Sequence, residues 1–533
     1  MAILSNFQVT GTGGDIEVTP PVQSGTLKYN GSSQSPTWTT YASDVITITN
    51  TAQTNAGSYN AVATLQSGYI WSNTLNNSPQ NIPWKINKID GTSSLSKTSV
   101  DVSLGDSDTI TVTRSGDGAI VATSSDTSVA TVSVSGTTVT ITGISEGNAT
   151  VSIGINAGTN YNAIPAKSVD VMVKYLPVYG VEWAGTSDST MSRTDDALTL
   201  GNPNPAVNNG TGSSPFDNIM PWAGMVKSED ANAGTVVSIP KYYYKWTKTG
   251  DAMKLQIAPA SNGAAWATNN GFLCSPAHAD REDGQGERDV VYVGRYHCSS
   301  SNYKSTTGVK PKASLTRASF RTNIHNLGST IWQYDFAMYW TIAMLYLVEF
   351  ADWNSQKVIG YGCTKNGSDI ENMGGTDAMQ YHTGTNAVNR TTYGNIQYRW
   401  IEGLWDNGYD WCDGIYFSSA NVYCIKNPAN FSDNANGTLV GTRASSNDEI
   451  KSWFIPTVSG FEYALYPDTV FTDSSYSTYI CDRALYIGTY SGNVLSVGGS
   501  VSHSQFSGLF YLLGSNRSDA SSTNYGSRLM ILP

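Results

Sequence analysis

Residues 1–90 alternate apolar and polar side chains over short runs. Val45–Thr49 and Tyr59–Leu65 place apolar groups at about every second position, and turn-forming residues at Asn30-Gly31 and Asn55–Gly57 interrupt the pattern. Successive side chains of a strand point to opposite faces of its sheet, so this period indicates half-buried antiparallel strands. We predict a small all-β sandwich over residues 1–90.

The same period continues through residues 91–175. Ala130–Val134 and Val139–Thr142 alternate on either side of a turn at Ser135-Gly136. Two alternating runs joined by a short glycine-containing turn predict a β-hairpin with one apolar face. We therefore expect a second β-sandwich here.

The pattern changes after Tyr175-Leu176-Pro177, where Trp, Tyr, Met, His and all six cysteines become concentrated. Apolar residues recur at three- and four-residue spacing over 331–352, which predicts a largely buried helix, and a less regular pattern over 315–327 predicts a shorter helix that stops before Gly328. Short β-like runs among Gly, Asn and Ser loops fill 360–533. The predicted fold is multidomain, with a large α+β domain at 176–533.

Composition limits the possible partners. A chain of 533 residues is expected to hold about three domains, and its 11% aromatic content argues against long disorder. The net charge of −11, with no basic run, disfavours binding to nucleic acid or an anionic membrane surface. The longest charge-free apolar run, 336–348, is too short to span a membrane, so we expect no membrane insertion.

The cysteines and the N-terminal segment bear on the compartment. No C-x-x-C pair occurs, and Met1–Phe7 has neither a basic nor an apolar signal region. We expect synthesis and folding in a reducing cytoplasm, without a disulfide framework.

Catalytic and metal-binding patterns are weak. The five histidines lack zinc spacing, and no nucleotide-binding loop or serine-nucleophile elbow occurs. The segment 433–437 has Ala435 where a calcium loop needs an oxygen donor, which favours a turn and leaves other calcium geometries open. Glu402 with Asp413 could serve a glycosidase, but such acidic pairs are common. We expect no cofactor, no metal and no catalytic residue.

Two resemblances cover the first 175 residues. Leu27–Gly31, Asn55–Tyr59 and Ile82–Ile86 resemble segments of bacterial Ig-like repeats. Thr123–Asp126, Val129–Val132 and Gly143–Val151 are similar to the group 2 bacterial Ig-like family. That family builds stalks of adhesins and phage tail proteins, so the resemblance implies a spacer role for domains at 1–90 and 91–175.

A third resemblance covers about 176–533. Asp406–Trp411 is similar to the Gly-Asn-Val-Trp-Glu-Trp segment of C-type-lectin-fold proteins related to formylglycine-generating enzyme. The ordered segments Arg483–Leu485, Gly498–Ser500, Ser507–Phe510 and Gly526–Leu529 resemble the terminal part of phage tail C-type-lectin domains and of diversity-generating-retroelement variable proteins. The enzymatic relatives need a reactive cysteine pair near the C-terminus. The last cysteine here is Cys481, so the resemblance implies a non-enzymatic member.

This resemblance also implies roles for particular residues near a variable-type segment at 483–528. The expected structural frame is Gly498, Gly499, Gly508, Gly526, Arg528, Trp405 and Trp411. The expected receptor-binding residues are Val501, Ser502, His503, Gln505, Phe506, Leu509, Tyr511, Leu513 and Ser515. Such proteins hold variable side chains on a rigid frame, so function would depend on surface complementarity.

Together these features predict a bacteriophage virion adhesin, a tail fibre or other appendage made in the host cytoplasm. A C-type-lectin-fold tip would bind a host cell-surface receptor, protein or glycan, without covalent chemistry. The resemblance further implies a homotrimer, contact with other virion proteins through the N-terminal domains, and possible diversification by a retroelement. Two alternatives stay open: a head or tail decoration protein without its own receptor, and a surface-glycan hydrolase or formylglycine-generating-like oxidase.

Overall fold

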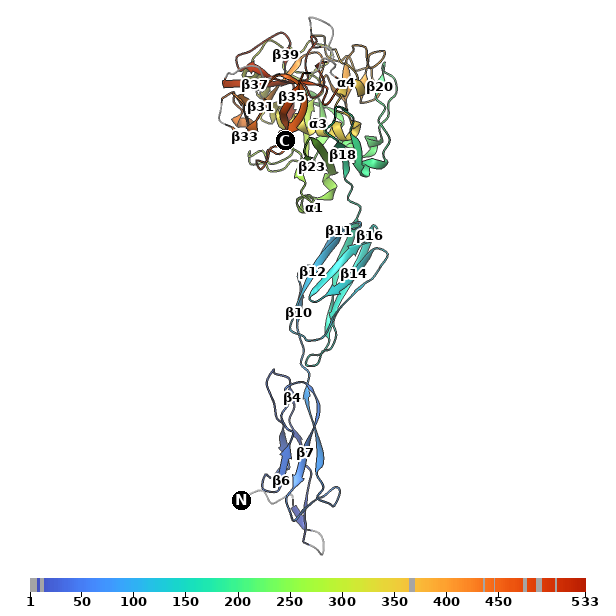
Figure 1. Cartoon of the computed structure of the whole chain (residues 1–533), viewed down its shortest axis with the longest axis vertical. Helices are drawn as coiled ribbons and strands as arrows, with labels where there is room; N and C mark the ends of the chain where they lie inside the picture. Colours follow the sequence, from blue (N-terminus) through green and yellow to red (C-terminus); the bar gives the residue numbers. More distant parts are fainter. Residues whose placement is uncertain are drawn as a thin grey trace. The chain divides into compact units, whose positions relative to one another are not determined.

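The computed structural model describes residues 7–9, 14–363, 370–434, 437–444, 446–472, 477–485, 491–503 and 506–533. The chain forms two compact units, Met1–Leu176 and Pro177–Pro533. The division falls within the Tyr175-Leu176-Pro177 segment, where the composition changes. Both units are built mainly of strands, and the main helix of the second unit lies among its sheets (Figure 1).

The first sandwich of the N-terminal unit has three described sheets. Their strands are β1 (Phe7–Val9), β2 (Ile16–Val18) and β8 (Tyr69–Trp71); β3 (Val22–Ser24) and β5 (Thr37–Thr39); and β4 (Leu27–Lys28), β9 (Gln80–Asn87), β7 (Gly57–Leu65) and β6 (Ile46–Thr49). The prediction of antiparallel strands from the alternating runs is confirmed by the pair β6–β7. Strand β4 joins β9 in parallel, which the alternating pattern alone did not reveal.

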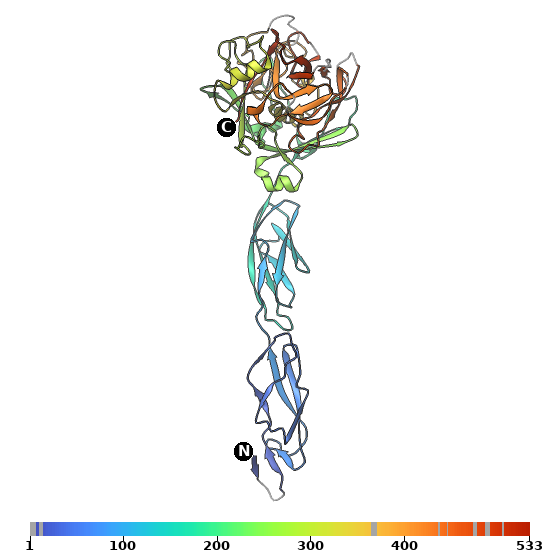
Figure 2. The same ribbon diagram turned by 90° about the vertical axis from the view of Figure 1, so that its left-hand side faces the viewer.

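The second sandwich consists of two four-stranded sheets, seen from two sides in Figures 1 and 2. One contains β10 (Ser93–Leu95), β12 (Ser107–Arg114), β15 (Thr138–Gly143) and β14 (Ala130–Ser135); the other contains β11 (Ser99–Ser103), β17 (Ile164–Lys174), β16 (Gly147–Ile155) and β13 (Ile120–Ser124). The predicted hairpin is confirmed as the antiparallel pair β14–β15. Buried valine, isoleucine and alanine side chains fill the space between the sheets.

The C-terminal unit contains four described sheets. The first sheet has the strand order β19 (Ser192–Asp195), β18 (Tyr179–Trp183), β24 (Ala252–Pro259), β23 (Tyr242–Thr249) and β25 (Leu273–Cys274). The second has the order β21 (Lys227–Asp230), β22 (Gly234–Pro240), β26 (Val290–Gly294), β40 (Leu529–Ile531) and β27 (Ile331–Gln333). The third has the order β20 (Ala206–Val207), β28 (Gly384–Thr385), β29 (Ile396–Tyr398) and β30 (Ile401–Glu402).

The fourth sheet carries the segment predicted to bind a receptor. Its order is β33 (Thr438–Thr442), β32 (Asn421–Cys424), β31 (Tyr409–Ser418), β37 (Ser491–Val497), β38 (Leu512–Arg517), β36 (Arg483–Leu485), β34 (Asp448–Phe454) and β35 (Tyr466–Phe471), with β39 (Tyr525–Gly526) beside β31. Strands β37 and β38 pair in antiparallel fashion, and the chain between them is described at 498–503 and 506–511. We call these two stretches the loop 498–511.

The helix predicted over 331–352 begins later than expected. Helix α3 spans Phe336–Phe350, and all its side chains are buried. Asp335 accepts a hydrogen bond from the Met338 backbone N–H at 2.7 Å and so caps the helix. Residues Ile331–Gln333 instead form β27, because β40 offers them backbone hydrogen bonds. Among the described residues no helix is long and apolar enough to cross a membrane.

The shorter helix predicted over 315–327 is observed as α2, Arg317–His325. Thr316 caps it by accepting a hydrogen bond from the backbone N–H of Ser319 at 3.2 Å. Helix α2 contacts both β27 and β31, and β31 pairs with β37, the strand that precedes the loop 498–511.

Candidate functional site

Arg528 holds together the frame beneath the predicted site. Its side chain is completely buried, and its Nε–H donates to the Asp410 carboxylate at 3.0 Å. The remaining donors bind the backbone carbonyls of Gly294, Arg295, Glu402 and Gly403. All five N–H groups of the guanidinium are therefore used within the protein, which leaves none for a ligand.

The other frame residues are also packed inside the unit. Trp405 and Trp411 are fully buried, and their indole N–H groups donate to the carbonyls of Gly360 and Leu315 at 3.1 Å each. Gly498 begins the loop at φ +85°, and a Cβ there would stand 2.3 Å from the Leu404 carbonyl oxygen. A side chain at this position would force the loop away from its support.

The inner half of the loop 498–511 is fixed by hydrogen bonds. The Asp482 carboxylate accepts from the Phe510 backbone N–H at 2.8 Å, and the Ser355 hydroxyl accepts from that of Leu509 at 2.9 Å. The Val501 N–H donates to the Asn407 carbonyl at 3.1 Å. Burial raises the pKa of Asp482 well above its usual value. The loop is thus held by partners from distant parts of the chain.

The nine residues expected to bind a receptor do not share one environment. Val501, Leu509, Tyr511 and Leu513 are buried. They cannot offer their side chains to a partner on this surface, because they fill the space between the loop and the sheet. Tyr511 and Leu513, for example, pack with Tyr409 in one cluster. These four residues were expected to contact a receptor, but their buried side chains support the loop instead.

Four of the five remaining residues reach solvent. Ser502 is exposed, and His503, Phe506 and Ser515 are partly exposed. We call these four the displayed residues. Gln505 lies outside the described residues. Buried and exposed positions thus alternate irregularly along the loop, as expected of a segment whose backbone is fixed from below.

Two of the displayed side chains are oriented by neighbours. His503 Nε2 lies 2.9 Å from the Tyr409 hydroxyl, and Nδ1 lies 2.9 Å from the Ser500 hydroxyl. Burial, together with the nearby positive charge of Arg483, lowers the pKa of His503, so the imidazole is neutral at pH 7. The Arg483 guanidinium also lies 4.8 Å from the centre of the Phe506 ring.

Residues weighed for catalysis serve structural networks. Glu402 accepts hydrogen bonds from the backbone N–H groups of Gly374 and Thr376 at 2.7 and 2.9 Å. Asp413 pairs with Arg321 at 2.6 Å, and Asp433 pairs with the same arginine at 2.8 Å. The two acids considered for a glycosidase are therefore each engaged in a separate network. Among the described residues, no group of three or more His, Cys, Asp or Glu side chains could hold a metal ion.

The six thiols are not activated. All are free cysteines, and five are buried. Burial raises the pKa of every thiol, to about 12 for Cys274 and Cys481. A raised thiol pKa reduces the population of the nucleophilic thiolate at neutral pH.

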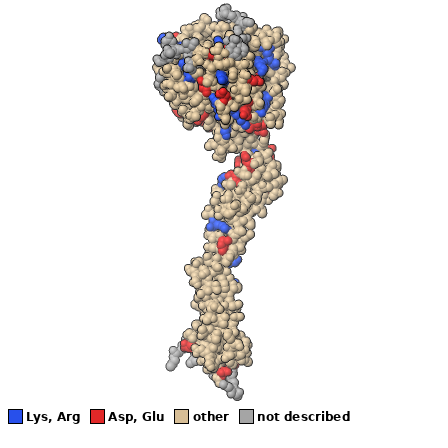
Figure 3. Space-filling model, viewed as in Figure 1, with Lys and Arg blue, Asp and Glu red and all other residues tan. Residues whose placement is uncertain are grey.

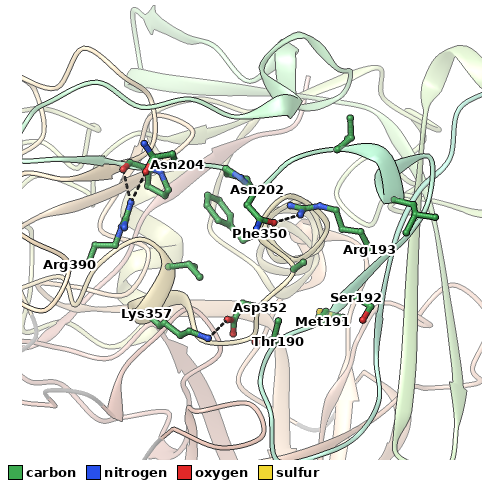
Figure 4. Close-up of a pocket in the computed structure, with 16 residues that line it drawn as sticks. Thr190, Met191, Ser192, Arg193, Asn202, Asn204, Phe350, Asp352, Lys357 and Arg390 are labelled. Carbon is green, nitrogen blue, oxygen red and sulfur yellow. Dashed lines mark hydrogen bonds and ion pairs between the residues drawn. The ribbon is translucent and has the colours of Figure 1, made fainter.

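A second candidate site, which the sequence did not indicate, is a pocket of about 700 Å³ in the C-terminal unit (Figure 4). Side chains from the segments 190–193 and 198–205 line it together with the end of α3, with helix α4 (Ser355–Val358), and with Arg390. We call it the arginine pocket because Arg193 and Arg390 lie on its wall. Three cationic and one acidic side chain line it, a formal excess of two positive charges.

The sequence offered no signal for this pocket. Its lining comes from segments that are more than 100 residues apart in places, such as Arg193 and Phe350. Each polar residue by itself looks like an ordinary surface or turn residue. Only the fold brings the two arginines to one cavity, so a pattern within a short window could not identify it.

Neither a protein-family model nor a curated protein matches this chain. Among solved structures, domains 4 and 5 of the S-layer protein SbsC match 29% of this chain and 98% of their own, with 21% identity and a TM-score of 0.15. Invasin, a bacterial integrin-binding protein, matches 45% of this chain and 54% of its own, with 14% identity and a TM-score of 0.19. The Yersinia pseudotuberculosis adhesin InvE matches 48% and 80%, with 11% identity and a TM-score of 0.15. The described residues form a mostly β, multi-sheet protein. The solved structures named above include adhesins, but TM-scores this low carry no argument about the fold or the function of this chain.

Proposed function

We propose that the chain is a bacteriophage virion adhesin that binds a host-surface receptor noncovalently through its C-terminal unit. In this proposal that unit is a non-enzymatic C-type-lectin-fold domain, and the two sandwiches are spacers that attach to other virion proteins. The resemblances of the sequence to phage tail tips and to stalk domains support the assignment. Assembly as a homotrimer belongs to the same proposal.

The observation that carries the proposal is the construction of the loop 498–511. Its inner residues are fixed by Asp482, Ser355 and Asn407, while Ser502, His503 and Phe506 reach the surface. Recognition is strongest when contact residues are held in place before the partner arrives, because little conformational entropy is then lost on binding. A loop built in this way can change its displayed residues without losing its support.

The direct test is adhesion of the labelled full chain to a panel of bacterial strains, measured by flow cytometry. We expect binding to particular strains, and a loss of about tenfold or more when His503→Ala and Phe506→Ala are combined, since aromatic anchors dominate small interfaces. Tyr41→Ala, at an exposed position of the first sandwich, is the control and should leave adhesion unchanged.

Three outcomes would count against this proposal. Full-length chain that binds no strain would favour a decoration role without its own receptor. Adhesion that persists in the double variant, with an unchanged melting temperature, would remove the displayed residues from the contact surface. A steady release of reducing sugar from bound cells would favour the hydrolase alternative.

A further inference from the structure

The arginine pocket contains two guanidinium groups that, within the described part of the chain, donate hydrogen bonds only to neutral oxygen acceptors. Arg193 donates to the Asn202 side-chain oxygen at 2.7 Å and to the Glu349 carbonyl. Arg390 donates to the Asn204 side-chain oxygen at 3.3 Å and to the Pro205 carbonyl at 2.9 Å. Among the described residues, the Nε atoms of both arginines are buried without a hydrogen-bond partner.

This arrangement differs from that of other arginines in the same unit. Arg399, Arg321 and Arg528 pair with carboxylates at 2.6, 2.6 and 3.0 Å. No such pair joins Arg193 or Arg390 to a described acidic side chain. A protein with net charge −11 therefore leaves two positive charges without a direct acidic partner at one cavity.

The acidic side chain in the pocket is already occupied. Both oxygens of Asp352 accept hydrogen bonds, one from the Asn354 backbone N–H and one from the Lys357 ammonium, each at 2.9 Å. Glu349, near Arg193, pairs with Arg399 at 2.6 Å and accepts from the Tyr398 hydroxyl at 3.0 Å. Glu349 attracts Arg193 electrostatically, but among the described residues neither carboxylate forms an ion pair with Arg193 or Arg390.

The wall of the pocket is rigid. Helix α3 ends at Ala351, which has a left-handed φ of 53°, and the Met191 backbone N–H donates to the Ala351 carbonyl at 2.7 Å. Thr190 and Asp352 also form a β-bridge. Figure 4 shows Phe350 between the Arg390 and Arg193 sides of the pocket, with Asp352 and Lys357 side by side. A cavity of this size that is formed before binding is typical of a small-molecule site.

We propose that the arginine pocket binds a carboxylated saccharide unit, whose carboxylate is attracted by the positive charges of Arg193 and Arg390 on the pocket wall. The planar fork of arginine matches the two oxygens of a carboxylate. Asn202 and Asn204 are exposed and suit sugar hydroxyls, and Leu198, which is 70% exposed, offers apolar surface to the ring. The choice of a saccharide rests on the proposed surface-recognition function, whereas the anion preference rests on the pocket itself.

The test uses the full chain on an array of carboxylated and matched neutral oligosaccharides, followed by calorimetry with trigalacturonic acid and its methyl ester. We expect a preference for carboxylated members, and affinity for trigalacturonic acid that falls roughly tenfold or more with Arg390→Gln, the loss expected for a charge-assisted pair. Asn202→Asp should have a similar effect, because it places a negative charge beside Arg193 and changes an exposed residue. Lys310→Gln, an exposed loss of one positive charge outside the pocket, should change nothing.

Several results would overturn the inference. Equal binding of the acid and its ester, no preference on the array, or unchanged affinity in both variants would each exclude it. Inorganic phosphate that competes as well as the saccharide would show a general anion site and exclude sugar recognition. If the chain adheres to cells but shows no such preference, the pocket inference fails while the adhesin proposal stands. If the chain binds the saccharide but no cells, the adhesin proposal fails instead.

Discussion

The two units of the chain achieve stability in opposite ways. Among the described residues of the N-terminal unit, every buried side chain is apolar, and its ion pairs, such as Lys97 with Asp108, lie on the surface. The C-terminal unit buries many charged groups, including the pairs Arg399–Glu349 and Arg528–Asp410. On the face shown in Figure 3, charged residues are sparse over the first sandwich and more numerous over the C-terminal unit.

This difference suits the two tasks that we propose for the units, spacing and recognition. An apolar core between two sheets is nondirectional and tolerates repetition, which a spacer needs. Buried ion pairs require exact partners and lose their value when one partner is removed. Hydrogen bonds to the buried Asp482 and Ser355 side chains likewise hold the backbone of Phe510 and Leu509 in the loop 498–511, as the proposed recognition surface requires.

The largest predicted effect comes from breaking a buried pair. Arg528→Met leaves the Asp410 carboxylate and four backbone carbonyls without their donor, and should destabilise the C-terminal unit by about 3–5 kcal/mol. Hydrogen exchange measured by mass spectrometry should show lost protection throughout the C-terminal unit and none in Met1–Leu176. Equal loss of protection in both units would show that the buried pair does not stabilise the C-terminal unit in particular.

A smaller but still large effect should follow from a cavity in the second sandwich. Ile141 is completely buried, so Ile141→Ala should cost about 2–5 kcal/mol. Ser133, exposed on the neighbouring strand β14, supplies the control Ser133→Ala, which should shift stability by less than about 0.5 kcal/mol. Hydrogen exchange should place the loss in this sandwich alone. A cost for Ser133→Ala that approaches that of Ile141→Ala would show that the period-two pattern does not define this core.

The same contrast explains what could be predicted from the sequence. The runs at 45–49, 59–65, 130–134 and 139–142 appear as strands, because a local period of two determines which face of a strand is buried. The edge pairing of β4 with β9 was missed because parallel pairing is a contact between distant segments that no local pattern encodes. The start of α3 was missed for a related reason, since β40 near the C-terminus draws 331–333 into a sheet.

The candidate site was less predictable than the fold. Leucine and tyrosine occur both in buried strands and on contact surfaces, so the residue types at 509 and 511 do not decide between the two. Only the tertiary packing shows that Leu509 and Tyr511 are buried. His503 and Phe506, in contrast, do reach solvent. The arginine pocket could not be predicted from the sequence, because the lack of acidic partners for Arg193 and Arg390 among the described residues depends on the fold of the whole unit. No short segment contains that information.

The next predicted effect is a change in how the stability of the C-terminal unit depends on pH when Asp406 is replaced. Burial, reinforced by the negative charge of Glu402, raises the pKa of Asp406 to about 8. Its folded pKa exceeds its unfolded value, so its contribution to stability is fully present below pH 4 and is lost as the pH rises to about 8. Within that window the slope can approach about 1.4 kcal/mol per pH unit. Asp406→Asn should therefore flatten the stability of the C-terminal unit between pH 5 and pH 8 in chemical unfolding experiments. If the free energy of unfolding changed with pH in the same way in Asp406→Asn and in the wild type, the raised pKa of Asp406 would be contradicted.

The smallest predicted effect concerns an ion pair in the N-terminal unit. Lys97 and Asp108 approach to 2.6 Å, closer than Arg528 and Asp410 at 3.0 Å, but their side chains are 43% and 33% exposed. If distance determined the strength of such pairs, Lys97→Met would be the more damaging substitution. We expect instead a loss of about 0.2–1 kcal/mol, because water already solvates both charges and salt screens them. The loss of stability is measured by unfolding of the full chain at low salt and at 1 M salt. For Lys97→Met the loss should fall toward zero at 1 M salt, whereas for Arg528→Met it should persist at both salt concentrations. A Lys97→Met cost comparable to that of Arg528→Met would mean that burial is not what separates the two units.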